Sequence, residues 1–346
     1  MRTMTDTIRN TARRLLADKT ADRIVGWEKG EFAYDPTPAV FGSPESLEKL
    51  VYNDFCGANL SKYVIREAKG LRWFESTSLR NLVRETTKPG KIAVLLKPCD
   101  SYSLNQLIRE HRVDRDHVYA VGVPCPGMLD IDKLRALGVK GVRGVKADGG
   151  ELIVNTLYGG KQCRREDVLL EKCLSCKGKT HVIADEVIEA DWADSDLPVP
   201  DRFATVAELE AMTPDERFAF WRSELSKCIR CNACRNACPA CSCVQCIFDN
   251  PRSGVAAKAS SDPAEENLFH IIRAFHVAGR CTDCGECSRV CPQHIPLHLL
   301  NRKMIKDINE FYGDYQAGAD TESRSPLTDY TQGDVEPGIV RERSAT

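Results

Sequence analysis

Residues 228–239 read CIRCNACRNACP, and residues 281–292 read CTDCGECSRVCP. Both segments follow the pattern C-x2-C-x2-C-x3-C-P, so the chain contains an internal repeat of four cysteines and a proline. Three thiolates at this spacing can reach one 4Fe-4S cluster from a single tight loop. A zinc ribbon uses two C-x2-C pairs and leaves the third cysteine and the Cys-Pro step unexplained. The repeat therefore predicts two 4Fe-4S clusters.

The eight cysteines of the repeat divide into two ligand sets. In two-cluster ferredoxins the fourth cysteine of each run ligates the other cluster, and we apply the same rule here. The first thiol set is Cys228, Cys231, Cys234 and Cys291. The second thiol set is Cys281, Cys284, Cys287 and Cys238.

Composition narrows the class of protein. The chain has 346 residues, enough for about two domains, and a formal net charge of −2, which gives no reason to expect nucleic acid as a partner. Its N-terminus lacks the apolar stretch of a signal peptide, and no run of 18 apolar residues predicts a membrane span. We therefore expect a cytoplasmic protein, in which its 17 cysteines are ligands rather than disulfides.

The rest of the sequence predicts a second, different domain. Residues 91–96 and 117–123 are short apolar runs typical of buried strands, with a helical pattern between them, and this order favours a parallel α/β unit. Thr213, Pro214 and Glu216 form the start signal of a helix that leads into the first cysteine run. We expect an α/β N-terminal domain with a mostly parallel sheet, fused to an all-α ferredoxin-like dicluster domain.

The expected boundaries follow from these patterns. They are an N-terminal helical segment at 1–30, the α/β domain at 31–200, the ferredoxin domain at 213–312 and a polar tail at 313–346. The acidic, proline-containing residues 191–200 indicate a linker. The tail is expected to be mobile or to become ordered only on a partner. Residues 267–278 predict an amphipathic helix whose apolar stripe holds Leu268, Ile271, Ile272 and Phe275.

Residues 275–300, FHVAGRCTDCGECSRVCPQHIPLHLL, resemble a known domain. They are similar to the α-helical ferredoxin domain of succinate dehydrogenase iron–sulfur subunits and of heterodisulfide reductase C-type subunits. The resemblance covers about residues 215–312 and implies the fold more strongly than a particular function.

Cysteines in the N-terminal half carry a second resemblance. Lys97-Pro98-Cys99-Asp100 follows the first predicted strand, Pro124-Cys125-Pro126-Gly127 follows the next, and a C-x2-C pair comes later. This order resembles the β-subunit family of deazaflavin-linked, coenzyme-reducing hydrogenases and formate dehydrogenases, whose corresponding domain holds one 4Fe-4S cluster and a flavin. Because the carboxyl ends of parallel strands meet at one ligand-binding edge, we expect a third cluster there. The third thiol set is Cys99, Cys125, Cys173 and Cys176.

The flavin is a separate expectation. The resemblance implies FAD, with Cys56-Gly57 and Lys97-Asp100 as the candidate place for it. The sequence contains neither G-x-G-x-x-G nor a G-x-x-x-x-G-K-S/T loop, so no dinucleotide or triphosphate motif supports a further site.

Three cysteines just after the first run have two readings. Cys241, Cys243 and Cys246 either support an extra centre or are small buried residues packed near the first cluster, and we favour the second reading. Cys163 could replace one member of the third set, and Cys56 has no evident partner.

Together these features predict an iron–sulfur electron-transfer subunit of a multisubunit oxidoreductase. It would relay single electrons through two or three 4Fe-4S clusters, with formate dehydrogenase, hydrogenase or heterodisulfide reductase-like subunits as partners and no catalytic residue of its own. One alternative is a flavoenzyme subunit in which FAD exchanges a hydride with a soluble carrier. Others are a disulfide-reducing catalytic subunit, which the absence of an adjacent Cys-Cys pair disfavours, and an iron–sulfur sensor or scaffold.

Overall fold

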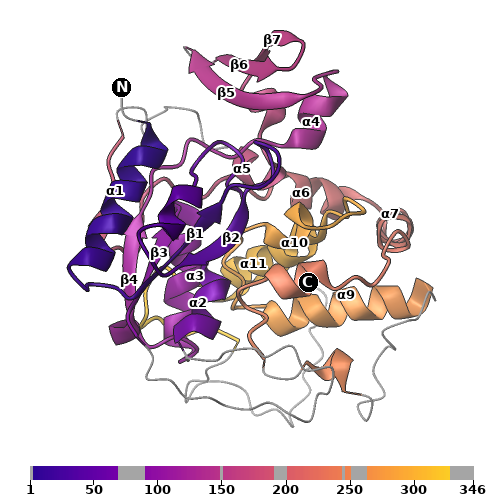
Figure 1. Ribbon diagram of the computed structural model, residues 1–346. Helices are drawn as coiled ribbons and strands as arrows, with labels where there is room; N and C mark the ends of the chain where they lie inside the picture. Colours follow the sequence, from indigo (N-terminus) through magenta and orange to yellow (C-terminus); the bar gives the residue numbers. More distant parts are fainter. Residues whose placement is uncertain are drawn as a thin grey trace.

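A five-stranded sheet lies at the centre of the N-terminal half of the molecule (Figure 1). The computed structural model describes residues 3–68, 90–148, 151–190, 201–243, 246–250 and 263–327. The strands of the sheet, in spatial order, are β2 (Thr37–Phe41), β1 (Arg23–Glu28), β3 (Ile92–Leu96), β4 (Val118–Gly122) and β8 (Glu186–Val187). All neighbouring pairs are parallel except β1 with β2. The mostly parallel sheet expected from the sequence is confirmed.

The core of this sheet is apolar on both faces. Every residue of β3 is buried, as expected for a central parallel strand covered by helices. Helix α1 (Met4–Ala17) contributes Ile8 and Leu15, and helix α3 (Pro98–Arg109) contributes Leu104 and Leu107, to the same core. Helix α2 (Ser61–Ala68) packs against α3 and β3.

The expected N-terminal helical segment at 1–30 is wrong beyond Ala17. Helix α1 begins with a capping box between Thr3 and Asp6 and ends at Ala17, and residues 23–28 form strand β1. Ile24 and Val25, which the sequence pattern assigned to the helix, pair with β3 in the sheet core. Their β-branched side chains favour a strand once a parallel partner is available.

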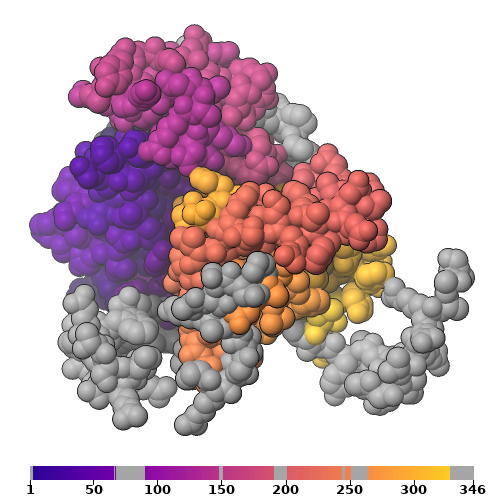
Figure 2. Space-filling view, turned by 90° about the vertical axis from the view of Figure 1, so that its right-hand side faces the viewer, coloured from indigo at the N-terminus to yellow at the C-terminus, as the bar shows by residue number. Residues whose placement is uncertain are grey.

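A second, smaller sheet lies at the top of the molecule in Figure 1, and this part of the chain forms the magenta upper part of the surface in Figure 2. Strands β5 (Val142–Asp148), β6 (Glu151–Thr156) and β7 (Gly159–Arg164) are antiparallel. Together with helix α4 (Ile131–Ala136) they enclose a separate core that includes Leu134, Leu152 and Val154. This separate sheet was not predicted from the sequence. The C-terminal end of this unit leads into the short helix α5 (Glu171–Leu174).

Helices form all of the regular structure described after residue 200. They are α6 (Ala204–Ala211), α7 (Pro214–Leu225), α8 (Ala233–Ala237), α9 (Pro263–Val277), α10 (Glu286–Arg289) and α11 (Leu297–Tyr312). The predicted start of α7 is confirmed, because Thr213 and Glu216 form a capping box.

Four short 3-10 helices are also described along the chain: η1 (Ser46–Lys49), η2 (Arg115–His117), η3 (Glu166–Val168) and η4 (Ile247–Asp249). The linker expected at 191–200 lies outside the described residues.

The first part of the expected tail is packed against the rest of the molecule, which corrects the expectation of a mobile segment for residues 313–327. The Tyr315 hydroxyl accepts a hydrogen bond from Arg109 of α3 at 2.9 Å and donates one to the Gly279 carbonyl oxygen at 2.9 Å. The Ser325 hydroxyl, fully buried, also donates to the Gly279 carbonyl oxygen. These bonds connect the segment to both the α/β part and the helical part. Residues 328–346 lie outside the described part of the chain.

A glycine at the contact between this segment and α3 provides a test. Gly318 has a φ of +76°, and a Cβ atom placed on it would overlap the Tyr102 carbonyl oxygen, whereas Gly313 has a φ of +87° and open space around it. Gly313→Ala is expected to lower the free energy of unfolding by about 1–3 kcal/mol through the backbone conformation alone, because a φ of 87° with a ψ of 178° is essentially restricted to glycine. Gly318→Ala is expected to cost about 1–3 kcal/mol more, because the segment must also shift away from α3. Denaturant unfolding of both variants measures the difference, and equal losses would show that the segment is not packed there.

Candidate metal centres

The first thiol set lies around one cavity in the helical part. Cys228, Cys231, Cys234 and Cys291 all line it, together with Phe269 and His270 of α9. Two of these thiols come from the loop before α8, one from α8 itself and one from the start of the segment that follows α10. The structure therefore brings together the four cysteines that the crossover rule predicted.

The two cysteine runs share a backbone conformation as well as a sequence pattern. Arg230 and Asn232 of the first run have φ values of 55° and 62°, and Asp283 and Gly285 of the second run have 54° and 66°. Alternating left-handed residues of this kind turn successive amide groups to one side and create an anion-binding concavity. The Arg230 amide lies 3.4 Å from the Cys228 sulfur, as a hydrogen-bond donor to it. Each loop is thus shaped to donate amide hydrogen bonds to sulfur.

The second thiol set is buried between the two runs. Cys238, Cys284 and Cys287 are at most 8% exposed, and Cys281 is partly exposed. The charge of Cys238 acts on each of the other three thiols, so this last cysteine of the first run lies beside the second run. Burial raises the pKa of Cys284 to about 12 and that of Cys287 to about 11. Without a bound cation these groups would stay protonated, whereas a coordinating metal ion deprotonates a thiol.

Residues of the α/β part hold the second set in place. The Lys62 ammonium of α2 donates to the carbonyl oxygens of Cys238 at 2.9 Å and Cys241 at 2.7 Å. Ser103 of α3 and Thr282 share a hydrogen bond of 2.8 Å at a buried position. Both contacts fix the backbone next to predicted ligands from the neighbouring domain.

The third thiol set lies at the carboxyl edge of the parallel sheet. Cys99 is in the first turn of α3 directly after β3, and Cys125 follows β4. Since β3 and β4 are parallel neighbours, their ends meet at one edge. Cys173 of α5 and Cys176 come from a later part of the chain. All four thiols line one cavity. The Met128 amide donates to the Cys173 sulfur at 3.3 Å.

The second and third sets are neighbours. Asp283 and Cys284 of the second cysteine run line the same cavity as the third set. Lys172, next to Cys173, is 9% exposed, and its ammonium donates to Glu286, next to Cys287, at 2.5 Å and to the Gly57 carbonyl oxygen at 2.7 Å. A buried ion pair therefore joins a residue beside the third set to a residue beside the second.

Buried polar atoms without a protein partner lie around these thiols. Among the described residues, both ring nitrogens of His270, Nε and Nη2 of Arg273 and the Lys177 ammonium accept or donate no hydrogen bond. Burial lowers the pKa of His270 to about 3, so its ring is neutral and carries one N–H. An unpaired buried donor costs about 1–3 kcal/mol, and cluster sulfurs are acceptors for such donors. The residues present therefore fit iron–sulfur clusters.

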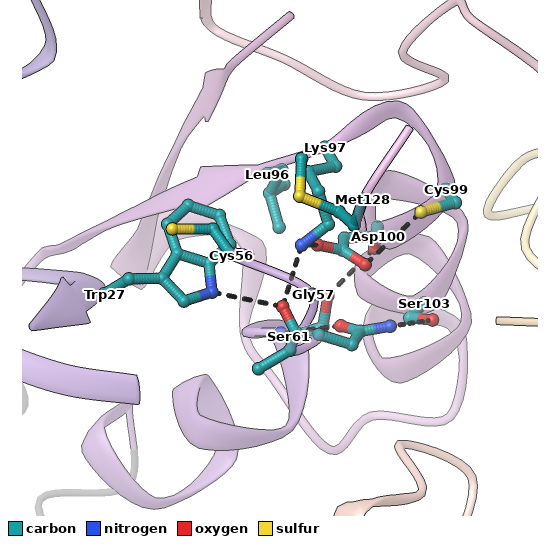
Figure 3. A network of polar contacts seen from close by, with 12 residues as sticks. Trp27, Cys56, Gly57, Ser61, Leu96, Lys97, Cys99, Asp100, Ser103 and Met128 are labelled. Carbon is teal, nitrogen blue, oxygen red and sulfur yellow. Dashed lines mark hydrogen bonds and ion pairs between the residues drawn. The ribbon is translucent and has the colours of Figure 1, made fainter. Parts of the chain in front are cut away.

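The expected place for FAD is occupied by a network of the protein's own side chains (Figure 3). The Lys97 ammonium, 1% exposed, contacts Asp100 at 2.8 Å, donates to the Ala58 carbonyl oxygen at 2.8 Å and lies 4.4 Å from the Trp27 ring centroid. Cys56 is fully buried in the same core. These groups are bonded to one another, so this predicted place does not fit a bound flavin. Binding of FAD elsewhere in the chain stays a prediction.

The cysteines outside the three thiol sets lie in different parts of the molecule. Cys163 lies in β7 of the small sheet, opposite Leu152, and Cys56 is a core residue whose pKa burial raises to about 12. Cys241 packs beside Cys238 and Val277, at the second thiol set rather than the first. Cys243 is exposed, so the interpretation of these residues as buried near the first cluster is wrong for Cys243.

Sequence reasoning missed the polar residues of α9. Glu266 and His270 place one ligand atom each within 4.8 Å of one another and of the Cys228 sulfur. Burial raises the pKa of Glu266, which favours its protonated form beside the thiol. Their spacing of four residues puts them on one helix face, and this E-x-x-x-H pattern was the signal available in the sequence.

None of the helices that the structure describes is long and apolar enough to cross a membrane.

Comparison with known protein families identifies the type of domain in the C-terminal half. A family described as a 4Fe-4S dicluster domain matches residues 224–295, which contain both cysteine runs. The chain therefore carries a dicluster iron–sulfur domain.

The particular relatives match nearly the whole chain. It is 22% identical to the F420-dependent formate dehydrogenase subunit beta of Methanocaldococcus jannaschii, over 90% of this chain and 91% of that protein. It is 23% identical to the F420-dependent formate dehydrogenase 1 subunit beta of Methanococcus maripaludis, over 90% of each. The resemblance to β subunits of this kind is confirmed. A chain of the F420-reducing [NiFe] hydrogenase complex from Methanosarcina barkeri aligns with a TM-score of 0.35 at 14% identity, over 49% of this chain and 58% of that one.

Proposed function

We propose that the chain is an iron–sulfur electron-transfer subunit of an oxidoreductase complex, with three thiol sets arranged in series. The α/β domain holds the third set and the helical domain holds the second and first. The observation that carries the proposal is the cavity of the third set, which is also lined by Cys284 of the second. When bound, each 4Fe-4S cluster takes up and releases one electron at a time.

The residues of the chain perform three tasks in this proposal. The thiols hold the clusters, and the left-handed residues of the two loops aim amide donors at sulfur. Burial of the second set excludes water from the middle of the series. The structure describes all twelve predicted ligands, and among them Cys231 alone is exposed. The first thiol set therefore lies nearest the surface, where it supports electron exchange with a partner.

The partner is proposed from the relatives. Both are β subunits of formate dehydrogenases by name, so we propose a formate dehydrogenase catalytic subunit as the partner. Hydrogenase and heterodisulfide reductase-like subunits are the alternatives. The cytoplasmic location stays a prediction. The flavoenzyme alternative is disfavoured, because Lys97 and Asp100 are paired with each other at the predicted place for FAD.

Native anaerobic purification of the tagged chain tests the proposal. We expect a brown protein with about four irons and four acid-labile sulfides per cluster, reducible and reoxidisable by a low-potential donor, together with a co-purifying redox subunit. A mock purification from cells with the untagged chain is the control. A folded, iron-free protein would contradict the clusters. An iron-loaded chain that purifies alone would contradict the complex, and clusters that do not cycle would favour the sensor or scaffold.

A further inference from the structure

Helix α9 buries three polar residues on the face that also carries Phe269 and Val277, and it exposes apolar residues on the other face. Its polar residues Glu266, His270 and Arg273 are 2%, 1% and 3% exposed, whereas Leu268 and Phe275 are 46% and 61% exposed. Charged residues are almost never fully buried unless they are paired. The buried polar face therefore needs charged or polar groups opposite it, and the cysteine runs lie there.

The position of Arg273 on this face follows from helical geometry. Phe269, four residues before it, packs in one cluster with Cys234 and Cys287. Val277, four residues after it, packs with Cys238 and, at the edge of the same group, Cys281. Residues four apart lie on one side of a helix, so Arg273 lies between the contacts to the first thiol set and those to the second.

The charge of Arg273 has no carboxylate counterpart among the residues that the structure describes. Its guanidinium forms a hydrogen bond with the Cys287 side chain, and Nε and Nη2 have no hydrogen-bond partner. The groups that lie close enough to act on the guanidinium include the Cys287, Cys238 and Cys234 thiols. These three sulfurs belong to both sets, one to the first and two to the second. A buried cation is retained only when negative charge compensates it.

We propose that Arg273 is the shared counter-ion of the first and second cluster sites and raises the reduction potentials of both. The inference rests on the proposed function, because it requires clusters at these thiols. Each reduction adds negative charge to a site, and a fixed positive charge beside that site favours the reduced form. Arg273 touches no substrate, so it is a positioning residue whose effect is electrostatic.

The test is a potentiometric titration of the full chain, followed by electron paramagnetic resonance, in the wild type and in Arg273→Met. We expect the iron content to be kept and the midpoint potentials of both helical-domain clusters to move to more negative values. Arg222→Met is the matched control, because it removes the same charge from the exposed side of α7 in the same domain, and it should move neither midpoint.

The results of this titration distinguish a wrong role for Arg273 from a wrong iron–sulfur function of the chain. Unchanged midpoints in Arg273→Met, or a shift of one cluster alone, would overturn the shared role. If the Met variant does not take up iron, Arg273→Lys decides, since it keeps the charge. Iron uptake restored by lysine supports the counter-ion role, and failure of the folded lysine variant overturns it. An iron-free wild type would instead remove the proposed function itself.

Discussion

Replacing Cys99 by serine is expected to remove about four irons per chain, the whole of one 4Fe-4S cluster. Cys99 lies in the first turn of α3, and its thiol lines one cavity with those of Cys125, Cys173 and Cys176. A serine hydroxyl is neither ionised at neutral pH nor a soft ligand, so three thiolates would remain for a cluster that needs four. Iron and acid-labile sulfide analysis of the anaerobically purified variant measures the loss.

The control for this prediction is Cys163→Ser. Cys163 is also partly exposed, but it lies in β7 against the core of the small sheet and does not line the cavity of the third set. Its replacement should leave the iron content unchanged. If Cys99→Ser also keeps all of its iron, the third cluster is wrong, while the two clusters of the helical domain stand unaffected.

Glu286→Gln is expected to cause a large loss in the free energy of unfolding. Glu286 is 2% exposed, and it accepts hydrogen bonds from Lys172 at 2.5 Å and from Arg289 at 2.8 Å and 2.9 Å. Removing its charge leaves the buried Lys172 ammonium without its counter-ion, together with the Arg289 guanidinium, whose side chain is 26% exposed. Breaking a buried pair such as Lys172–Glu286 costs about 3–5 kcal/mol of the free energy of unfolding. Because Lys172 belongs to the α/β part, the loss also loosens the contact between the second and third thiol sets.

Glu210→Gln provides the comparison. Glu210 of α6 also contacts two cations, Lys303 and Lys306 of α11, but its side chain is 27% exposed, so we expect a loss of about 0–1 kcal/mol. Denaturant unfolding of iron-loaded protein under argon measures both variants. Equal, small losses would show that the Lys172–Glu286 pair does not hold the two domains together.

The same pair predicts a pH dependence. Burial raises the pKa of Glu286, but the charges of Arg289 and Lys172 and their hydrogen bonds outweigh it and hold the pKa well below its usual range. A depressed pKa means that the stabilisation is complete above the unfolded value, about 4.3, and is lost as the pH falls below it toward the folded value. The wild type should therefore lose more stability than Glu286→Gln on acidification below about pH 4.

The sequence determined the local chemistry of the site. Short spacings act over a few residues of backbone, so each C-x2-C-x2-C-x3-C-P run predicts three thiols on one loop. The fourth thiol of each set comes from the other run and was predicted from the two-cluster ferredoxin rule, and the structure places the four thiols of each set close together. The capping box at Thr213 and the buried strands at 92–96 and 118–122 were predictable for the same reason. The three-thiol loops, the cap and the strands are each predicted from neighbours along the chain.

The tertiary structure alone decided which residues face one another over long distances. The apolar stripe of residues 267–278 indicated a helix but not that its polar face would be buried, because that choice depends on the charged groups packed opposite. Arg273 is adjacent in sequence to no cysteine, and Lys172 and Glu286 are 114 residues apart, so no spacing rule could pair them. Strand β1 likewise needed its partner β3, about 70 residues further along the chain. Long-range electrostatic and strand pairing depend on packing, and a linear pattern does not encode packing.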